Sequence, residues 1–166
     1  APTGTLPASA SLQIVSSDEN APEEGLGLLM TGNTAGPCIQ VTPSPLSFGG
    51  KAIGELSVLP VEIVSCGSAP LEISGIALSK GSSPDFALDM TSLPGFEDGS
   101  APSEEQKLVV PSNETVSFVL RFNPDAENPK DSQNQPIPDV AHILVSNNTF
   151  NSVIDVEATG VGVDVT

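Results

Sequence analysis

The chain has 166 residues, with five Lys and Arg against 21 Asp and Glu, which gives a formal net charge of −16 at pH 7. This charge repels nucleic-acid phosphates and anionic membrane surfaces, so the composition excludes a nucleic-acid-binding function. The chain has no Trp and no Tyr, so it lacks the aromatic platform on which sugars stack, and no apolar stretch is long enough for a membrane-spanning helix.

The first 37 residues look like a copy of the end of the chain. Residues 8–36 parallel residues 138–162: each stretch has an apolar strand ending in Val-Ser, a polar turn, a second apolar strand and then Thr-Gly. Such internal similarity is typical of repeat arrays. The pattern predicts a β-hairpin and a short linker at residues 34–37. A disordered tail is the alternative, although the apolar content is high for disorder.

This hairpin needs a partner. The domain already has a closing hairpin at residues 140–160, and an isolated hairpin is marginally stable in water. Exposed apolar faces with unpaired strand edges recruit another chain. The predicted partner-strand interface consists of Leu12, Ile14, Leu26, Leu28 and Met30. A chain that starts at Ala1 without a signal segment fits an exported, processed chain or a piece of a longer one.

The pattern of apolar residues in 38–80 predicts three consecutive strands. The first, 38–48, is interrupted by Pro43 and Pro45, which lack an N–H donor and so place it at a sheet edge or kink. The second, 56–66, is apolar on both faces, as expected of a strand inside a sheet. A third strand resumes after the break at 66–70.

Cys38 and Cys66 are the only cysteines. If strands 38–48 and 56–66 pair antiparallel about the turn at 49–55, Cys38 lies opposite Cys66. A disulfide there would stabilise the fold by roughly 3 to 4 kcal/mol in the chain-entropy model. Two unlinked buried thiols are the alternative. Two Cys and one distant His do not make a zinc ligand set.

The remaining chain predicts strands separated by loops. Residues 81–107 read as a polar loop with one short strand at Phe86, and residues 123–139, with four prolines, read as a surface loop. Residues 115–122 alternate in strict period two and predict a core-facing strand. We expect these residues to be buried: Phe48, Val61, Ile63, Phe86, Phe118 and Phe122.

The acidic loops make calcium the one cofactor to consider. Asp125, Glu127 and Asp131 lie close in sequence, and hard cations prefer several such oxygens at once. However, Pro129 and Lys130 stand where a calcium loop needs a ligand and a flexible Gly, so a solvated acidic loop is the alternative. No Gly-x-Ser-x-Gly turn or Cys and His pair supports a nucleophile, so we expect no enzyme activity.

Two stretches resemble a known family. The sequence VTPSPLSFGG at residues 41–50 and VSCGSAPLEISGI at residues 64–76 are similar to the ASPM/SPD-2/Hydin-like repeats, which bacterial choice-of-anchor surface proteins also carry. The resemblance extends over about residues 38–163. It implies an immunoglobulin-like sandwich and a binding or spacer role. Ser65-Cys66-Gly67 replaces the family's usual Asn-Thr-Gly, which suggests an added disulfide, and the acidic segment after Pro124 is longer than usual.

Taken together, the sequence predicts an all-β protein: an immunoglobulin-like antiparallel β-sandwich of the PapD and major-sperm-protein type at residues 38–166, with an N-terminal β-hairpin extension within residues 1–37. The favoured function is a non-enzymatic assembly module of an extracellular or cell-surface array or fibre. It would associate head-to-tail with other copies of itself, or with adjacent repeats, through the N-terminal strands. The alternative is an adhesive or ligand-binding module of a tandem-repeat surface protein, with or without calcium, that presents loops 84–106 and 123–139.

Overall fold

A computed structural model describes residues 8–14, 26–32 and 36–165, with the backbone alone for the first two ranges. These residues form β-strands and no helix. In chain order the strands are β1 (Ala8–Ile14), β2 (Leu26–Gly32), β3 (Ile39–Thr42), β4 (Leu46–Ala52), β5 (Ser57–Ser65), β6 (Leu71–Leu78), β7 (Phe86–Asp89), β8 (Leu108–Val110), β9 (Thr115–Phe122), β10 (Asp139–Asn147) and β11 (Val153–Val163). Among the described residues there is no helix that is long and apolar enough to cross a membrane.

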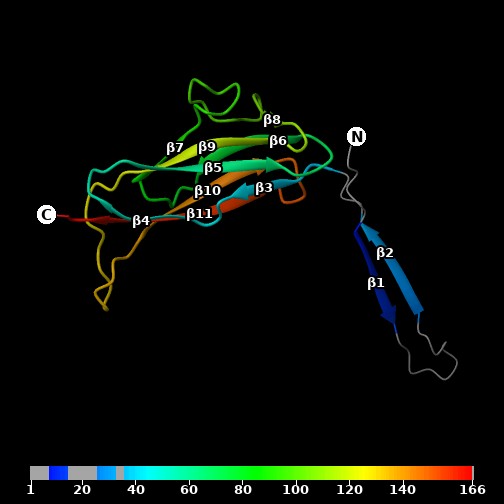
Figure 1. Ribbon diagram of the computed structural model, residues 1–166, viewed down its shortest axis with the longest axis horizontal. Helices are drawn as coiled ribbons and strands as arrows, with labels where there is room; N and C mark the ends of the chain where they lie inside the picture. The colour runs from blue at the N-terminus through cyan, green and yellow to red at the C-terminus, as the bar shows by residue number, and fades with distance from the viewer. Residues whose placement is uncertain (1–7, 15–25, 33–35, 166) are drawn as a thin grey trace.

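Two sheets pack face to face (Figure 1). One sheet has the strand order β4-β11-β10-β6-β8, and the other has the order β3-β5-β9-β7. Neighbouring strands are antiparallel, except that β4 runs parallel to β11. The structure confirms the predicted all-β sandwich and adds this parallel pair to the antiparallel arrangement.

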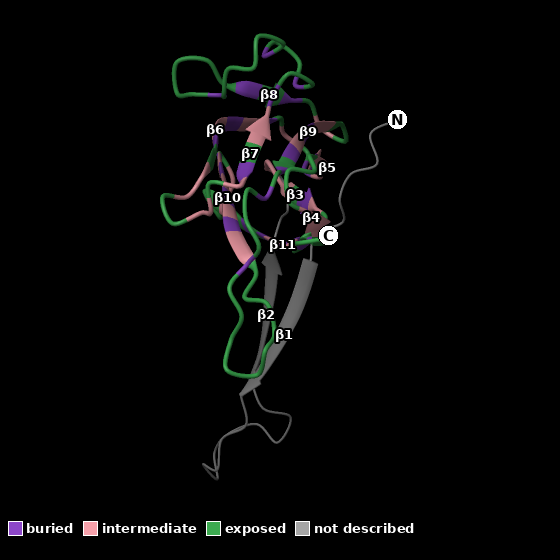
Figure 2. Ribbon diagram, turned by 90° about the vertical axis from the view of Figure 1, so that its left-hand side faces the viewer, coloured by how far each residue is buried: buried purple, intermediate pink, exposed green. Residues whose placement is uncertain are grey.

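The core lies between the two sheets, where apolar side chains from alternate strand positions meet (Figure 2). All six residues expected there are buried. At its centre, the ring centroid of Phe122 lies 4.8 Å from that of Phe86 and 5.3 Å from that of Phe48. Ring pairs at these separations stabilise a core beyond the area they bury.

The predicted single strand at 38–48 is wrong: the structure divides it into β3 and β4, which belong to different sheets. β3 pairs with β5 in the expected register, with Ile39 opposite Ser65 and Thr42 opposite Glu62. Pro43 and Pro45 follow, and because neither can donate to a ladder, the pairing with β5 stops there. The chain then crosses to the other sheet, where β4 pairs with β11.

The polar loop expected after β7 is only partly polar. Met90, Leu93 and Phe96 are buried in the core. The N–H of Leu93 donates to the carbonyl oxygen of Met90 (2.8 Å), and the N–H of Phe96 donates to that of Leu93 (3.1 Å). These two hydrogen bonds close two successive turns of three residues, so the side chains at positions 90, 93 and 96 all point into the core. The apolar residues at every third position are the sequence pattern from which this buried segment could have been predicted.

β1 and β2 form a two-stranded antiparallel sheet of their own, outside the sandwich (Figure 1). Their register pairs Leu12 with Leu28 and Ile14 with Leu26. Within the described residues, neither strand pairs with any strand of the sandwich. The side chains of the five predicted interface residues lie outside the described part of the chain, so their role and the domain boundary at residue 37 remain predictions.

Candidate interaction surfaces

The linker enters the sandwich at a fixed point. The carbonyl oxygen of Gly36 accepts hydrogen bonds from the N–H of Ser68 (3.1 Å) and the N–H of Ala69 (3.4 Å), and the N–H of Gly36 donates to Ser68 Oγ (3.1 Å). A Cβ atom on Gly67 would stand 2.1 Å from the Gly36 oxygen. The turn between β5 and β6 therefore holds Gly36 of the linker against the sandwich.

A disulfide reinforces the same point. Cys38 and Cys66 are bonded, with their Cα atoms 4.9 Å apart, as the predicted strand pairing required. The N–H of Cys66 also donates to the carbonyl oxygen of Cys38 (3.0 Å). The residue before β3 is thus covalently tied to the residue after β5, immediately after the linker.

This attachment limits where the N-terminal hairpin can lie. Four peptide steps separate Gly32, the last residue of β2, from Gly36. Since an extended chain spans at most about 3.6 Å per residue, β2 ends within about 15 Å of Gly36. Any unit that pairs with the hairpin must therefore approach the end of the sandwich that carries the β5–β6 turn.

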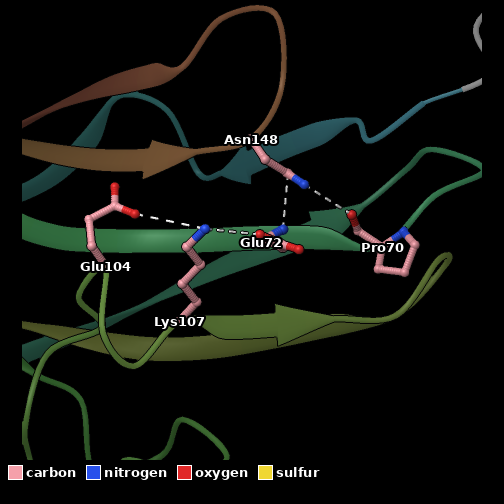
Figure 3. Close-up of polar contacts among 5 residues, drawn as sticks. All are labelled: Pro70, Glu72, Glu104, Lys107 and Asn148. Carbon is pink, nitrogen blue, oxygen red and sulfur yellow. Dashed lines mark hydrogen bonds and ion pairs between the residues drawn. The ribbon is translucent and has the colours of Figure 1, made fainter.

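The β10–β11 turn is held at this end too (Figure 3). Asn148 accepts a hydrogen bond from the N–H of Glu72 (3.0 Å) and donates from Nδ2 to the carbonyl oxygen of Pro70 (3.4 Å). Nearby, Lys107 Nζ lies 3.2 Å from Glu72 Oε2 and 3.7 Å from Glu104 Oε2. The hydrogen bond and charge of Glu72 raise the pKa of Lys107. These contacts fix the edge of the sheet.

Hydrogen bonds of Asn128 hold the base of the loop between β9 and β10. Asn128 Nδ2 donates to the carbonyl oxygen of Ile137 and to Asp139 Oδ2, both at 2.9 Å. The N–H of Asn128 donates to the Gly162 oxygen (3.2 Å), and the N–H of Gly162 donates to Asn128 Oδ1. A Cβ atom on Gly162 would stand 2.4 Å from the Ala126 oxygen. No sequence pattern predicts this anchor, because Asn128 and Gly162 are far apart in the chain.

The three residues predicted to hold calcium make separate contacts. Glu127 forms an ion pair with Lys130 (3.1 Å). Asp131 Oδ1 accepts hydrogen bonds from two backbone N–H groups of its own loop. Asp125 lies close enough to Asp85 for its charge to raise the pKa of Asp85. In the described part of the chain, no group of three or more His, Cys, Asp or Glu side chains is arranged to hold a metal ion. Calcium binding by Asp125, Glu127 and Asp131 stays a prediction.

Carboxylates nevertheless meet at the base of this loop. Burial raises the pKa of Asp85, and the neighbouring charges of Asp139 and Asp125 raise it further. Asp125 and Asp139 lie at the two ends of the β9–β10 loop, whereas Asp85 lies in the connection between β6 and β7, so the proximity of Asp85 to the other two could not be predicted from spacing. The raised pKa of Asp85 predicts a pH-dependent contribution to stability at this end of the sandwich.

The single histidine contacts a carboxylate rather than a nucleophile. His142 Nδ1 lies 2.9 Å from Asp155 Oδ1 across β10 and β11, and both side chains are exposed. The two cysteines are used in the disulfide. The arrangement around His142 is that of a surface pair across two strands.

The two loops that a binding module would present do not form one surface. The segment after β7 lies on one side of the sandwich, beside β8, and the loop between β9 and β10 projects on the other side (Figures 1 and 2). Both are exposed over most of their length (Figure 2). A partner that contacted both loops at once would have to span the sandwich.

Comparisons with known proteins place the fold. No family model matches the chain, and no curated protein matches it. Among solved structures, the ASH/PapD-like domain 7 of human CEP192 is 11% identical, with a TM-score of 0.50; the match covers 92% of this chain and 99% of that one. A protein of unknown function from Porphyromonas gingivalis is 12% identical, with a TM-score of 0.52, covering 96% and 68%. The secreted serine protease VesC of Vibrio cholerae is 10% identical, with a TM-score of 0.50, covering 79% of this chain and 24% of the protease.

At these identities the likeness shows the fold alone. It supports an immunoglobulin-like sandwich of the ASH and PapD-like type, as the sequence resemblance implied. The relation to bacterial choice-of-anchor surface proteins stays a prediction.

Proposed function

We propose that this chain is a structural unit of an extracellular or cell-surface array, and that β1–β2 joins it head-to-tail to a neighbouring immunoglobulin-like unit by main-chain pairing. The observation that carries the proposal is the separate two-stranded sheet of β1 and β2. A two-stranded sheet is marginal in water by itself, and its unpaired edges are templates for other strands. The neighbour is another copy of the chain, as in a fibre, or an adjacent repeat.

The way the linker is held supports a mechanical joint. Gly36 is hydrogen-bonded to Ser68, and the Cys38–Cys66 disulfide lies directly behind it. A load transmitted through β2 would therefore reach both sheets within a few residues of the joint. The disulfide also supports export, because such bonds persist in oxidising compartments.

The acidic surface supports the same setting. A formal charge of −16 keeps the unit soluble and gives it no attraction to anionic surfaces. Binding through the loops is the weaker alternative, because the two loops project on opposite sides of the sandwich.

The test compares the full chain with a chain that lacks residues 1–36, by light scattering and electron microscopy. Assembly of the full chain and a folded, monomeric truncated chain would support the joint, with other copies as neighbours. A full chain that stays monomeric would overturn the fibre of identical copies and leave an adjacent repeat as the neighbour. A truncated chain that fails to fold would overturn the proposal, because the segment would then belong to the core of its own sandwich.

A further inference from the structure

The N-terminal hairpin has the same strand register as the hairpin that closes the sandwich. In β1–β2, Ala8 pairs with Gly32 and Ile14 pairs with Leu26. In β10–β11, the corresponding ladder runs from the pair Asp139 and Gly160 to the pair Val145 and Ile154. Superposing the two ladders at Thr31-Gly32 and Thr159-Gly160 matches each residue of β1 to one residue of β10, and each residue of β2 to one of β11. Ile14, and not Val15 of the Val-Ser pair, then takes the register position of Val145.

This match places the apolar residues of the N-terminal hairpin at core positions. β10 and β11 point alternate residues into the sandwich, where Ile143, Val145, Val156 and Ala158 are fully buried and Ile154 packs against the core. The residues of β1–β2 at these five register positions are the five that the sequence predicted to need a partner: Leu12, Ile14, Leu28, Met30 and Leu26, respectively.

A glycine supports the same match. Gly160 lies against the buried ring of Phe122, where a Cβ atom would stand 2.6 Å from Cε1. The register partner of Gly160 in the N-terminal hairpin is Gly32. A hairpin with no sandwich to close has no need of glycine at that position. Glycine at position 32 would leave room for a bulky side chain from the opposite sheet, as Gly160 does for Phe122.

The place that β10–β11 occupy between β6 and β4 is termed here the closing-hairpin seat. We infer that β1–β2 fills the closing-hairpin seat of a neighbouring immunoglobulin-like sandwich that lacks its own last two strands. β1 would then pair antiparallel with a strand equivalent to β6, and β2 would pair parallel with a strand equivalent to β4. This inference rests on the proposed function and names the partner that the joint requires.

The register also argues against an intact copy of this chain as the partner. In an intact copy of this chain, the closing-hairpin seat is already filled by β10–β11. Moreover, Met30 would stand where Ala158 is fully buried, and a side chain that much larger does not fit a close-packed core. Of the two neighbours proposed above, these observations favour an adjacent repeat over another copy of the chain: the acceptor is a sandwich with a different sequence, whose core has more room opposite Met30.

The test exchanges strand sequences within the full chain. In the first variant, residues 140–145 (VAHILV) are replaced by residues 9–14 (SASLQI), which keeps Ala, Leu and Ile at the inward positions. In the matched control, the same residues are replaced by residues 10–15 (ASLQIV), which shifts the register by one and turns Ser and Gln inward. A one-residue shift moves every side chain of a strand to the opposite face.

We expect the in-register variant to unfold in a single cooperative transition, with a Tm within about 10 °C of the parent. We expect the shifted control to show no cooperative transition. Equal loss of folding in both variants would overturn the inference. Because the readout is the stability of the sandwich, it is independent of whether the full chain assembles.

A third variant tests the choice of partner. Ala158→Met introduces the side chain of Met30 at its register position, and we expect it to lower the Tm by about 2 to 10 °C. An unchanged Tm would show that the core accepts Met there, and would overturn the exclusion of copies of this chain as acceptors.

Discussion

The ring of Phe122 lies directly against Gly160: a Cβ atom on residue 160 would stand 2.6 Å from both Cε1 and Cζ of the ring. Phe122 is fully buried and forms the aromatic centre of the core with Phe48 and Phe86. Gly160 has no positive φ, so the space beside the ring, and not the backbone conformation, requires glycine here. The closing strand and the opposite sheet are therefore fitted to each other at this point.

Gly160→Ala should lower the free energy of unfolding by about 1 to 3 kcal/mol, because the Phe122 ring must move within a close-packed core. Urea denaturation at pH 7 measures the change. The matched control is Gly50→Ala in β4, where a Cβ atom would stand 3.5 Å from Val163 Cγ1, an ordinary contact. Equal effects of the two substitutions would show that the ring does not set the requirement.

Asn128→Ala should also destabilise the chain, because it leaves the N–H of Gly162 without its acceptor in a buried position. An unsatisfied buried polar group costs about 1 to 3 kcal/mol. Gln133→Ala, at an exposed position in the same loop, is the control and should change stability by less than about 0.5 kcal/mol. Limited proteolysis would detect the accompanying release of the loop; a loop that stays equally protected would count against the anchor.

The sequence predicted contacts that follow from local patterns. The register of β3 against β5, and with it the pairing of Cys38 with Cys66, followed from the antiparallel pairing predicted between residues 38–48 and 56–66. The connection between the two strands is more than the predicted turn, because it contains β4, which belongs to the other sheet. The core-facing residues of β9 could be predicted from strict alternation, because successive side chains of a strand point to opposite faces in any sheet. Phe118 and Phe122 are accordingly both buried.

Contacts between distant parts of the chain were not predictable in the same way. The prolines at 43 and 45 indicate a break in pairing, but the choice of β11 as the parallel partner of β4 depends on the whole sandwich. Asn128 contacts Gly162 across a separation of 34 residues, and no spacing rule relates them. The meeting of the Asp85 and Asp139 carboxyl groups was not predictable for the same reason, since Asp85 precedes β7 and Asp139 begins β10.

The disulfide makes a quantitative prediction. Replacing both Cys38 and Cys66 with Ser should lower the free energy of unfolding by roughly 3 to 4 kcal/mol, because a separation of 28 residues leaves a long loop open in the unfolded chain. Equilibrium denaturation compares the variant with the parent under non-reducing conditions. Titration of free thiols in the unfolded, unreduced parent should find none; two reactive thiols would disprove the bridge.

Two phenylalanines provide a matched pair for the core. Phe118 is fully buried, whereas Phe150 is fully exposed in the turn between β10 and β11. Phe118→Ala should cost about 3 to 5 kcal/mol, because it removes apolar contacts and leaves a cavity. Phe150→Ala should change stability by less than about 0.5 kcal/mol. Both values come from urea denaturation, and a large loss with Phe150→Ala would show that its ring packs within the isolated chain.

The raised pKa of Asp85 predicts how stability depends on pH. Burial, followed by the charges of Asp139 and Asp125, makes the folded state hold the Asp85 proton more tightly than the unfolded state does. The associated stabilisation is therefore complete below the usual value of 3.8 and is lost as the pH rises through the folded pKa. At neutral pH the ionised carboxylate of Asp85 opposes folding.

Asp85→Asn should accordingly raise the Tm at pH 7 and give no such gain at pH 3, where the parent carboxyl is protonated. The matched comparison is Asp89, whose pKa is lowered by hydrogen bonds from Thr91 and by Arg121. Its contribution has the opposite sign, because it is present above the usual pKa and lost as the pH falls through the folded pKa. Asp89→Asn should therefore lower the Tm at pH 7 and have less effect at pH 3. Thermal unfolding of both variants from pH 3 to 7 measures the two profiles, and a Tm of Asp85→Asn that follows the parent at every pH would contradict the assigned cluster.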